Sequence, residues 1–165
     1  MIEIIKINKE DKEKIKELSQ AAGAIVKEYY DPIIGAEQND YMIKLFQSPE
    51  GIHEQLNNGH TYYAAMEGDK YAGFISYYPK DGKLYLNKYY LSSEMRGKGY
   101  GHALMDFIKD KARESGYPAV FLNVNKYNSD SINIYKHFGF KIIRAEKNPI
   151  GNGFYMDDYV MEWRV

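Results

Sequence analysis

Cysteine is absent from this chain of 165 residues, which also has almost no net charge and no long apolar run. Without cysteine there are no disulfides, no thiolate metal ligands and no cysteine nucleophile, which fits a reducing, cytoplasmic environment. The 22 Lys and Arg against 23 Asp and Glu give a formal net charge of -1, whereas nucleic-acid-binding proteins usually carry a basic excess. No apolar run approaches the roughly 18 residues that span a membrane. The first residues, MIEIIKINKEDKEKIKE, are too charged for a signal peptide. We therefore expect neither nucleic acid nor a membrane as partner.

Tyrosine is the residue type in excess, with 17 Tyr beside 7 Phe and 1 Trp. A tyrosine has an apolar ring and a polar tip, so many of these side chains are expected to line clefts or half-buried sheet faces. The content of 44% hydrophobic and 27% charged residues is that of an ordinary globular protein. We expect one domain over residues 1–165.

The hydrophobic periodicity predicts short strands alternating with helices. Helical spacing covers residues 8–30, 99–115 and 129–138, and two shorter helical segments lie between Gly35 and Asn58, the second opened by Ser48 and Pro49. Pro32 is expected to stop the first helix at Asp31. Strands are expected at 2–7, 60–66, 71–78, 84–91, 119–124, 140–144 and 154–163. The prediction is an α/β fold: a mixed, mostly antiparallel seven-stranded sheet flanked by about four helices.

A glycine-rich basic loop is predicted between the strand ending at Leu91 and the next helix, and it holds Arg96, Gly97, Lys98, Gly99, Tyr100 and Gly101. Its glycines allow a sharp turn and leave backbone N–H groups accessible at a helix N-terminus, which favours an anion. The chain contains no Gly-x-x-x-x-Gly-Lys-Ser/Thr string, so the loop is not a P-loop. It is not a dinucleotide fingerprint either, because the required third glycine falls on His102. A phosphate-bearing ligand is the functional interpretation, and a solvated glycine-rich surface turn is the alternative.

A second motif follows about 27 residues later, in the segment VNKYNSDSINIYKHFGF from Val124 to Phe140. This segment resembles the second motif of the GNAT acetyltransferase superfamily. The shared features are a strand ending in Val, then Asn128, a small residue three positions later, Tyr135 four positions after that, and a Gly-Phe pair. The Arg96–Gly101 loop resembles the pyrophosphate motif of that family, and the order of the elements agrees over nearly the whole chain. The last strand more faintly resembles polyamine N-acetyltransferases.

The resemblance implies a GNAT-like acyl-CoA N-acyltransferase fold and acetyl-CoA as co-substrate. The backbone from Arg96 to His102 would hold the CoA pyrophosphate, and Tyr89, Tyr90 and Leu91 would bind the pantetheine arm where the fourth and fifth strands part. Asn128 would contact the pantetheine or an ordered water, and Ser131 would lie against the cofactor. Tyr135 would be the general acid that protonates the departing thiolate. Packing of its ring against the sheet is the alternative for this residue.

The chain departs from the family at the general base. Many relatives carry a Glu on the fourth strand, and the matching face here offers Tyr85 and Asn87. Either the acceptor amine binds in its neutral form and needs no base, or a remote acidic residue takes its proton through a water molecule. The remote candidates are Asp31, Glu37, Asp157 and Asp158. The four histidines show no metal-ligand spacing, and we expect no metal.

Two classes of function follow from the resemblance. The first is an acetyl-CoA-dependent N-acetyltransferase, which attaches acetyl directly, in a ternary complex, to a primary amine of a small molecule (a polyamine among the candidates) or of a peptide. The second is a non-catalytic acyl-CoA-binding or sensing module on the same fold. Tyr29, Tyr30, Tyr41, Tyr62 and Tyr63 would wall the acceptor site, with plain core packing as the alternative. A homodimer is compatible with either class.

Overall fold

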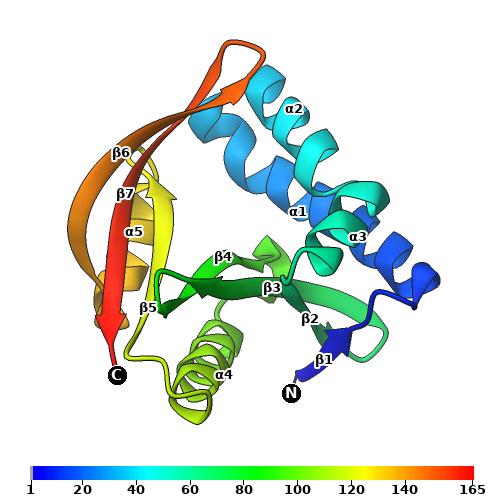
Figure 1. The fold of residues 1–165 in the computed structure, drawn as a ribbon. Helices are drawn as coiled ribbons and strands as arrows, with labels where there is room; N and C mark the ends of the chain where they lie inside the picture. Colours follow the sequence, from blue (N-terminus) through cyan, green and yellow to red (C-terminus); the bar gives the residue numbers. More distant parts are fainter. Residues whose placement is uncertain (1) are drawn as a thin grey trace. The chain divides into compact units, whose positions relative to one another are not determined.

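A computed structural model describes residues 2–165 and contains seven strands and five α-helices (Figure 1). The sheet order is β1-β2-β3-β4-β5-β7-β6, in which β4 and β5 run parallel, while the pairs β1–β2, β2–β3, β5–β7 and β6–β7 are antiparallel. The predicted mixed, mostly antiparallel α/β sheet is confirmed. In chain order the elements are β1 (Glu3–Ile7), α1 (Lys12–Ile34), α2 (Ala36–Phe46), α3 (Pro49–Asn57), β2 (Thr61–Glu67), β3 (Lys70–Lys80), β4 (Lys83–Leu91), the short η1 (Ser93–Met95), α4 (Tyr100–Glu114), β5 (Ala119–Asn125), α5 (Ser129–His137), β6 (Lys141–Gly151) and β7 (Phe154–Arg164).

The separate helix that Ser48 and Pro49 were expected to open is present as α3, which Ser48 caps through its Oγ, accepting from Gly51 N at 3.1 Å. Two details of the prediction are wrong. The first helix continues past Pro32 to Ile34; proline removes only its own N–H, and the last turn still closes with Gly35 N donating to Asp31 O at 3.0 Å. Finally, β6 runs to Gly151 instead of ending at Arg144, because its second half pairs with β7.

The chain divides into two compact units, Met1–Tyr78 with Lys88–Leu104, and Pro79–Asn87 with Met105–Val165. The core of the first unit lies between α1, α3 and the strands β1 to β3. Its helical members recur at the predicted three-and-four spacing, so one face of α1 is buried and the other is charged. The buried residues of this core are Ile7, Ile15, Leu18, Ala22, Ile25, Val26, Ile52, Tyr62, Ala64 and Phe74. That the two units make a single domain stays a prediction.

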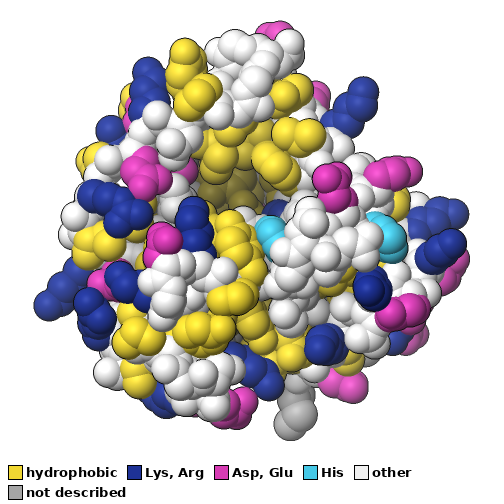
Figure 2. Space-filling view, viewed as in Figure 1, with side chains coloured by type: hydrophobic (Ala, Val, Ile, Leu, Met, Phe, Trp, Pro, Cys, Tyr) yellow, Lys and Arg dark blue, Asp and Glu magenta, His cyan; other side chains and the backbone are white. Residues whose placement is uncertain are grey.

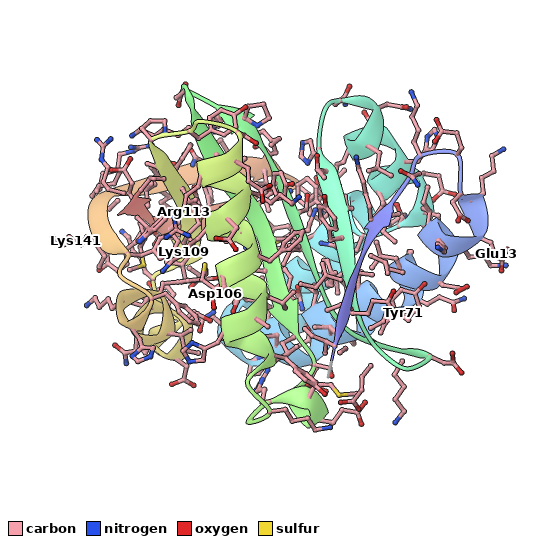
Figure 3. All side chains as sticks on the ribbon, turned by 90° about the horizontal axis from the view of Figure 1, so that it is seen from below. Glu13, Tyr71, Asp106, Lys109, Arg113 and Lys141 are labelled. Atoms are coloured by element: carbon pink, nitrogen blue, oxygen red, sulfur yellow. The ribbon has the colours of Figure 1, made fainter. Side chains whose placement is uncertain are left out.

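The second unit is built on β5, β7 and β6, with most of α4 beside them. Figure 3 shows Asp106, Lys109 and Arg113 along one side of α4. Lys109 Nζ lies 4.8 Å from the Trp163 ring centroid of β7 and donates to Phe138 O at 2.7 Å, and Arg113 Cζ is 5.2 Å from the same ring. Through these contacts the part of α4 that belongs to the second unit packs against β7.

Charges of both signs are interspersed on the face of the molecule shown in Figure 2, without a large region of one sign. This distribution agrees with the near-zero net charge. None of the helices within residues 2–165 is long and apolar enough to cross a membrane.

A close backbone approach joins β3 to β4. A Cβ built on Gly73 would lie 2.2 Å from Tyr90 O and 3.1 Å from Leu91 Cα, so the position has room for glycine only. We expect Gly73→Ala to lower the free energy of unfolding in urea by about 1–3 kcal/mol, as forced overpacking does. Gly23→Ala in α1 is the matched control: its Cβ would meet only Ile43 Cγ2 at 3.6 Å, and alanine is the better helix former. Equal effects of the two substitutions would contradict the close approach.

Candidate functional site

The glycine-rich loop between η1 and α4 is exposed and adopts backbone conformations that favour glycine. Gly97 has φ 78° and Gly99 has φ 81°, and nothing lies within 4 Å of a Cβ built on either residue. The loop therefore leaves an open cradle of backbone, and the glycines are required by conformation rather than by crowding. Accessible backbone N–H groups of this kind are suited to an anionic group.

Helix α4 begins directly after the cradle. Gly99 O accepts from Ala103 N at 3.2 Å, which is the first hydrogen bond of the helix. The N–H groups of the first turn, from Tyr100 to His102, consequently point back toward the loop, where the helix dipole favours negative charge. His102 is exposed in this turn. The predicted helix N-terminus after a glycine-rich turn is confirmed. The phosphate-bearing ligand expected there stays a prediction.

The loop is tied to the rest of its unit through Glu67 at the end of β2. Lys98 Nζ lies 3.2 Å from Glu67 Oε2, and the Tyr100 hydroxyl donates to the same oxygen. The Tyr100 hydrogen bond, followed by the Lys98 contact, lowers the pKa of Glu67. At the other end, the Tyr89 hydroxyl donates to Gly101 O at 2.6 Å. The structure thus brings together Tyr89, Lys98, Tyr100 and Gly101 as predicted site residues, with Glu67 as an anchor that sequence reasoning missed.

The end of β4 carries an aromatic face. The parallel register of β4 with β5 pairs Leu84 with Val120 and Tyr85 with Phe121, near the start of β4. On one face, the Tyr90 ring lies 5.9 Å from Tyr30 and 6.3 Å from Tyr29.

The aromatic residues expected around an acceptor divide into two groups. Tyr29 and Tyr30 meet Tyr90, and the Arg96 guanidinium lies 4.9 Å from the Tyr29 ring, so these rings border the phosphate loop. Tyr62, in contrast, is fully buried, and Tyr63 stacks on Tyr77 at 6.2 Å. Core and sheet packing is therefore the role that the structure gives to Tyr62.

The second predicted motif forms the start of α5. Asn128 is the N-cap of this helix, and its Oδ1 accepts from Ser131 N at 3.1 Å. The side chain is only 3% exposed, yet its Nδ2 has no hydrogen-bond partner among residues 2–165. A buried amide donor left without an acceptor is costly, and this one fits a ligand or water acceptor. Tyr135, one turn on, is 9% exposed, with its ring 5.8 Å from Phe140.

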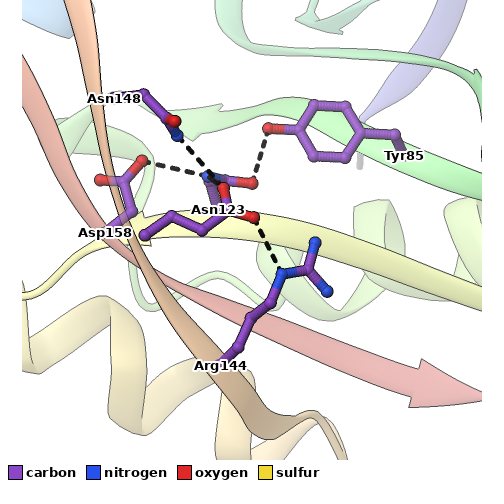
Figure 4. Close-up of polar contacts among 6 residues, drawn as sticks. Tyr85, Asn123, Arg144, Asn148 and Asp158 are labelled. Atoms are coloured by element: carbon purple, nitrogen blue, oxygen red, sulfur yellow. Dashed lines mark hydrogen bonds and ion pairs between the residues drawn. The ribbon is translucent and has the colours of Figure 1, made fainter.

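Tyr85 is one of the two residues on the β4 face where many relatives carry a glutamate, and Figure 4 shows its contacts. Its hydroxyl donates to Asn123 Oδ1 at 3.0 Å, and Asn123 Nδ2 lies 3.3 Å from Asp158 Oδ2 and 3.4 Å from Glu146 Oε2. Glu146 in turn accepts from Arg144 Nε at 2.8 Å. Burial raises the pKa of Asp158 to about 6, with the Asn123 hydrogen bond opposing the shift.

The remaining candidate bases differ in their surroundings. Asp31 accepts from Asn39 Nδ2 at 2.8 Å and pairs with Lys27 at 2.9 Å, and these two contacts lower its pKa, so Asp31 is a poor proton acceptor at neutral pH. Asp157 pairs with Lys126 at 3.0 Å. Glu37 is exposed on the first turn of α2.

No group of three or more His, Asp or Glu side chains within residues 2–165 is arranged to hold a metal ion. The expectation of a metal-free site stays a prediction.

Comparison with known proteins decides the family. The profile of the Acetyltransferase (GNAT) family matches residues 24–140. The chain belongs to this family. Over 93 residues it is 30% identical to streptothricin acetyltransferase of Streptomyces lavendulae, and the match covers 55% of this chain and 49% of that protein, so the chain spans about half the length of this curated relative.

Solved GNAT structures share the fold. The PaiA N-acetyltransferase of Thermoplasma acidophilum, crystallised with coenzyme A, is 24% identical with a TM-score of 0.79, covering 100% of this chain and 99% of that chain. A GNAT acetyltransferase of Elizabethkingia anophelis with acetyl-CoA bound has 18% identity and a TM-score of 0.59, over 69% and 82% of the two chains. These similarities confirm the GNAT fold.

Proposed function

We propose that this chain is an N-acetyltransferase that moves acetyl from acetyl-CoA to a primary amine, and that residues 1–165 act as one domain. The observation that carries the proposal is the open backbone cradle at Gly97 and Gly99, placed directly before the N-terminus of α4 in a chain of the GNAT family. Such a helix end binds phosphate groups through its N–H donors and dipole.

The cofactor contacts follow from the site. The backbone of Arg96, Gly97, Lys98, Gly99, Tyr100, Gly101 and His102 would hold the pyrophosphate. The backbone of Tyr89, Tyr90 and Leu91, at the end of β4 that leads into the loop, would bind the pantetheine, as the family motif implies. Lys98 is already paired with Glu67, so the backbone N–H groups rather than the Lys98 charge would carry most of the anion recognition.

The roles of α5 rest on the family motif together with one structural observation. Asn128 Nδ2, buried and without an acceptor, would donate to the pantetheine or to a bound water, and Ser131 would lie against the cofactor. Tyr135 would protonate the CoA thiolate as it leaves.

Asn128 allows its two roles to be separated. Asn128→Asp keeps an N-cap acceptor of about equal strength but removes the Nδ2 donor, whereas Asn128→Ala removes both. We expect both variants to bind acetyl-CoA about tenfold more weakly in calorimetry, because one hydrogen bond is lost. Only the alanine variant should lose about 1 kcal/mol of stability from the missing cap. Wild-type affinity in Asn128→Asp would restrict this residue to capping.

The acceptor class is proposed as a small-molecule amine, as the name of streptothricin acetyltransferase states for that relative. Polyamines and peptide amines are the alternative acceptor classes. The reaction is proposed to take place in the cytoplasm. Release of CoA thiol from acetyl-CoA, measured against a panel of these amines, should reveal turnover with at least one small-molecule amine. Tight CoA binding without turnover on any amine would instead favour the non-catalytic sensing module. Light scattering of the same preparation measures whether the chain is a homodimer.

A further inference from the structure

A lysine without an acidic partner lies inside the first compact unit. Lys88, on β4, is 7% exposed and makes no ion pair with a carboxylate within residues 2–165. Its Nζ lies 2.7 Å from Gln55 Oε1 of α3 and 2.8 Å from the Tyr62 hydroxyl of β2. A buried ammonium without a counter-ion is costly, and buried lysines are accordingly rare unless paired.

The hydrogen bonds around this amine can all be made by its neutral form. The Tyr62 hydroxyl donates its own proton to Gln55 Oε1 at 2.7 Å, so the Tyr62 oxygen can only accept from Lys88. Lys88 therefore donates two hydrogen bonds, to Gln55 and to Tyr62. A neutral amine has two N–H donors and one lone pair. The neutral form thus satisfies both acceptors and keeps its lone pair available for a proton.

Among residues 2–165, the groups that face Lys88 include no carboxylate that would hold a proton on the amine. Phe46 of α2 and Tyr62 present ring faces, with centroids 5.9 Å and 5.3 Å from Nζ, and Gln55 is uncharged. Ring faces attract a cation only weakly and do not replace a counter-ion, so burial dominates. His60 is the other titratable neighbour, and burial followed by the Lys88 charge lowers its pKa to about 4, so it is neutral too. Burial raises the pKa of Tyr62, which therefore stays protonated at neutral pH. Desolvation lowers the pKa of Lys88 from 10.5 to about 7.

The position of Lys88 along β4 relates it to the proposed cofactor segment. Lys88 directly precedes Tyr89–Leu91, and the phosphate loop begins shortly after Leu91. In the proposed binding mode, a pantetheine arm that follows the strand would lead away from the loop, and its thioester end would lie toward Lys88, about 10 Å along the strand from Leu91. Gln55 and Phe46, beside the amine, keep exposed surface on α3 and α2.

We propose that the neutral amine of Lys88 is the general base that takes the first proton from the acceptor ammonium, in place of the strand glutamate that this chain lacks. This inference rests on the proposed acetyl transfer. The ammonium of the acceptor gives one proton to Lys88 Nζ, and its nitrogen then attacks the thioester carbonyl carbon. The C–N bond forms and the C–S bond breaks. Tyr135 would protonate the thiolate, which leaves as CoA thiol, and the second proton lost by the nitrogen restores the Tyr135 phenol. Lys88 returns its proton to solvent.

Two substitutions separate a base from a mere charge. Lys88→Met removes the amine while filling a similar volume, and Lys88→Arg keeps a cation that cannot deprotonate in this range. With wild type, kcat/KM should rise with pH through about 7 for two acceptors whose amine pKa values differ by a unit or more. In both variants we expect kcat/KM at pH 7.5 to fall about 10²-fold. The pH at which kcat/KM rises should then move to the amine pKa of each acceptor. Lys70→Met, at an exposed end of β3, is the control expected to behave as wild type.

The outcomes distinguish this inference from the proposed function. If wild type binds acetyl-CoA but no amine is acetylated, the proposed function fails; if transfer occurs and its rise tracks the acceptor pKa already in wild type, only the role of Lys88 fails. Recovery of activity in Lys88→Arg would show an electrostatic role. A rise that survives in Lys88→Met but disappears in Asp158→Asn would assign the base to Asp158. Acetylation of Lys88 itself, detected by mass spectrometry after incubation with acetyl-CoA alone, would make it a nucleophile and overturn the proposal.

Stability provides a readout that does not depend on activity. Because the folded pKa of Lys88 is depressed, the unfolded chain binds more protons between pH 7 and 10, and wild type should gain stability as pH rises through this window. The advantage of Lys88→Met over wild type in Tm should therefore shrink from pH 7 to pH 10. A constant difference would contradict the neutral buried amine.

Discussion

Gly101→Glu is expected to weaken acetyl-CoA binding by about 100-fold or more while the chain remains folded. The substitution puts a negative charge into the first turn of α4, where the helix dipole and N–H donors would otherwise meet the pyrophosphate. Loss of even one or two hydrogen bonds to a charged group, each contributing about 1.5–3 kcal/mol, is enough for this effect. Isothermal titration calorimetry with acetyl-CoA measures it directly.

The structure also indicates how to control this experiment. A Cβ on Gly101 would lie 3.3 Å from the Tyr89 hydroxyl, so some local adjustment accompanies any substitution here. Gly101→Ala carries the same adjustment without the charge and should lose less affinity than Gly101→Glu. Gln20→Glu, on the exposed face of α1, adds the same charge elsewhere and should bind as wild type does. Unchanged affinity in a folded Gly101→Glu protein would remove the pyrophosphate from this loop.

Tyr135→Phe is expected to slow kcat about 10²-fold and to leave acetyl-CoA affinity within a few-fold. The phenol is the proposed proton donor to the departing thiolate, and a positioned general acid contributes typically 10²–10⁴-fold. The ring, 9% exposed and packed 5.8 Å from Phe140, is retained in the variant, so the loss should not come from unfolding.

A second tyrosine provides the comparison. Tyr127, 71% exposed, lies near α5 in sequence, and Tyr127→Phe should leave kcat unchanged. Turnover of Tyr135→Phe at the wild-type rate from pH 6 to 10 would reduce Tyr135 to a packing residue and leave protonation of the thiolate to water.

The order of strands and helices could be predicted because apolar periodicity is local information. The strands β2 to β4 follow from apolar residues two positions apart, and the amphipathic face of α1 follows from apolar residues three or four positions apart. The end of α1 could not be predicted in the same way, because Pro32 disfavours helix locally while contacts of Asp31 with Asn39 and Lys27 support the last turn.

The site was predictable where function depends on backbone, and less so where it depends on distant side chains. Gly97 and Gly99 reveal the loop because their conformation requires glycine. Glu67 lies 31 residues before Lys98, and no local pattern marks it as the anchor of that loop. Lys88 was visible as the single charge at the centre of a strand, but its lack of an acidic partner emerges only from the fold.

Titration of the ¹⁵N-labelled chain with CoA and, separately, with pantetheine tests the central claim most directly, since it reports which backbone N–H groups meet which part of the cofactor. We expect CoA to shift the amide resonances of Gly97 to His102 together with those of Tyr89 to Leu91. Pantetheine, which lacks the pyrophosphate, should shift only the second set. Shifts from CoA that leave Gly97 to His102 unaffected would contradict the account.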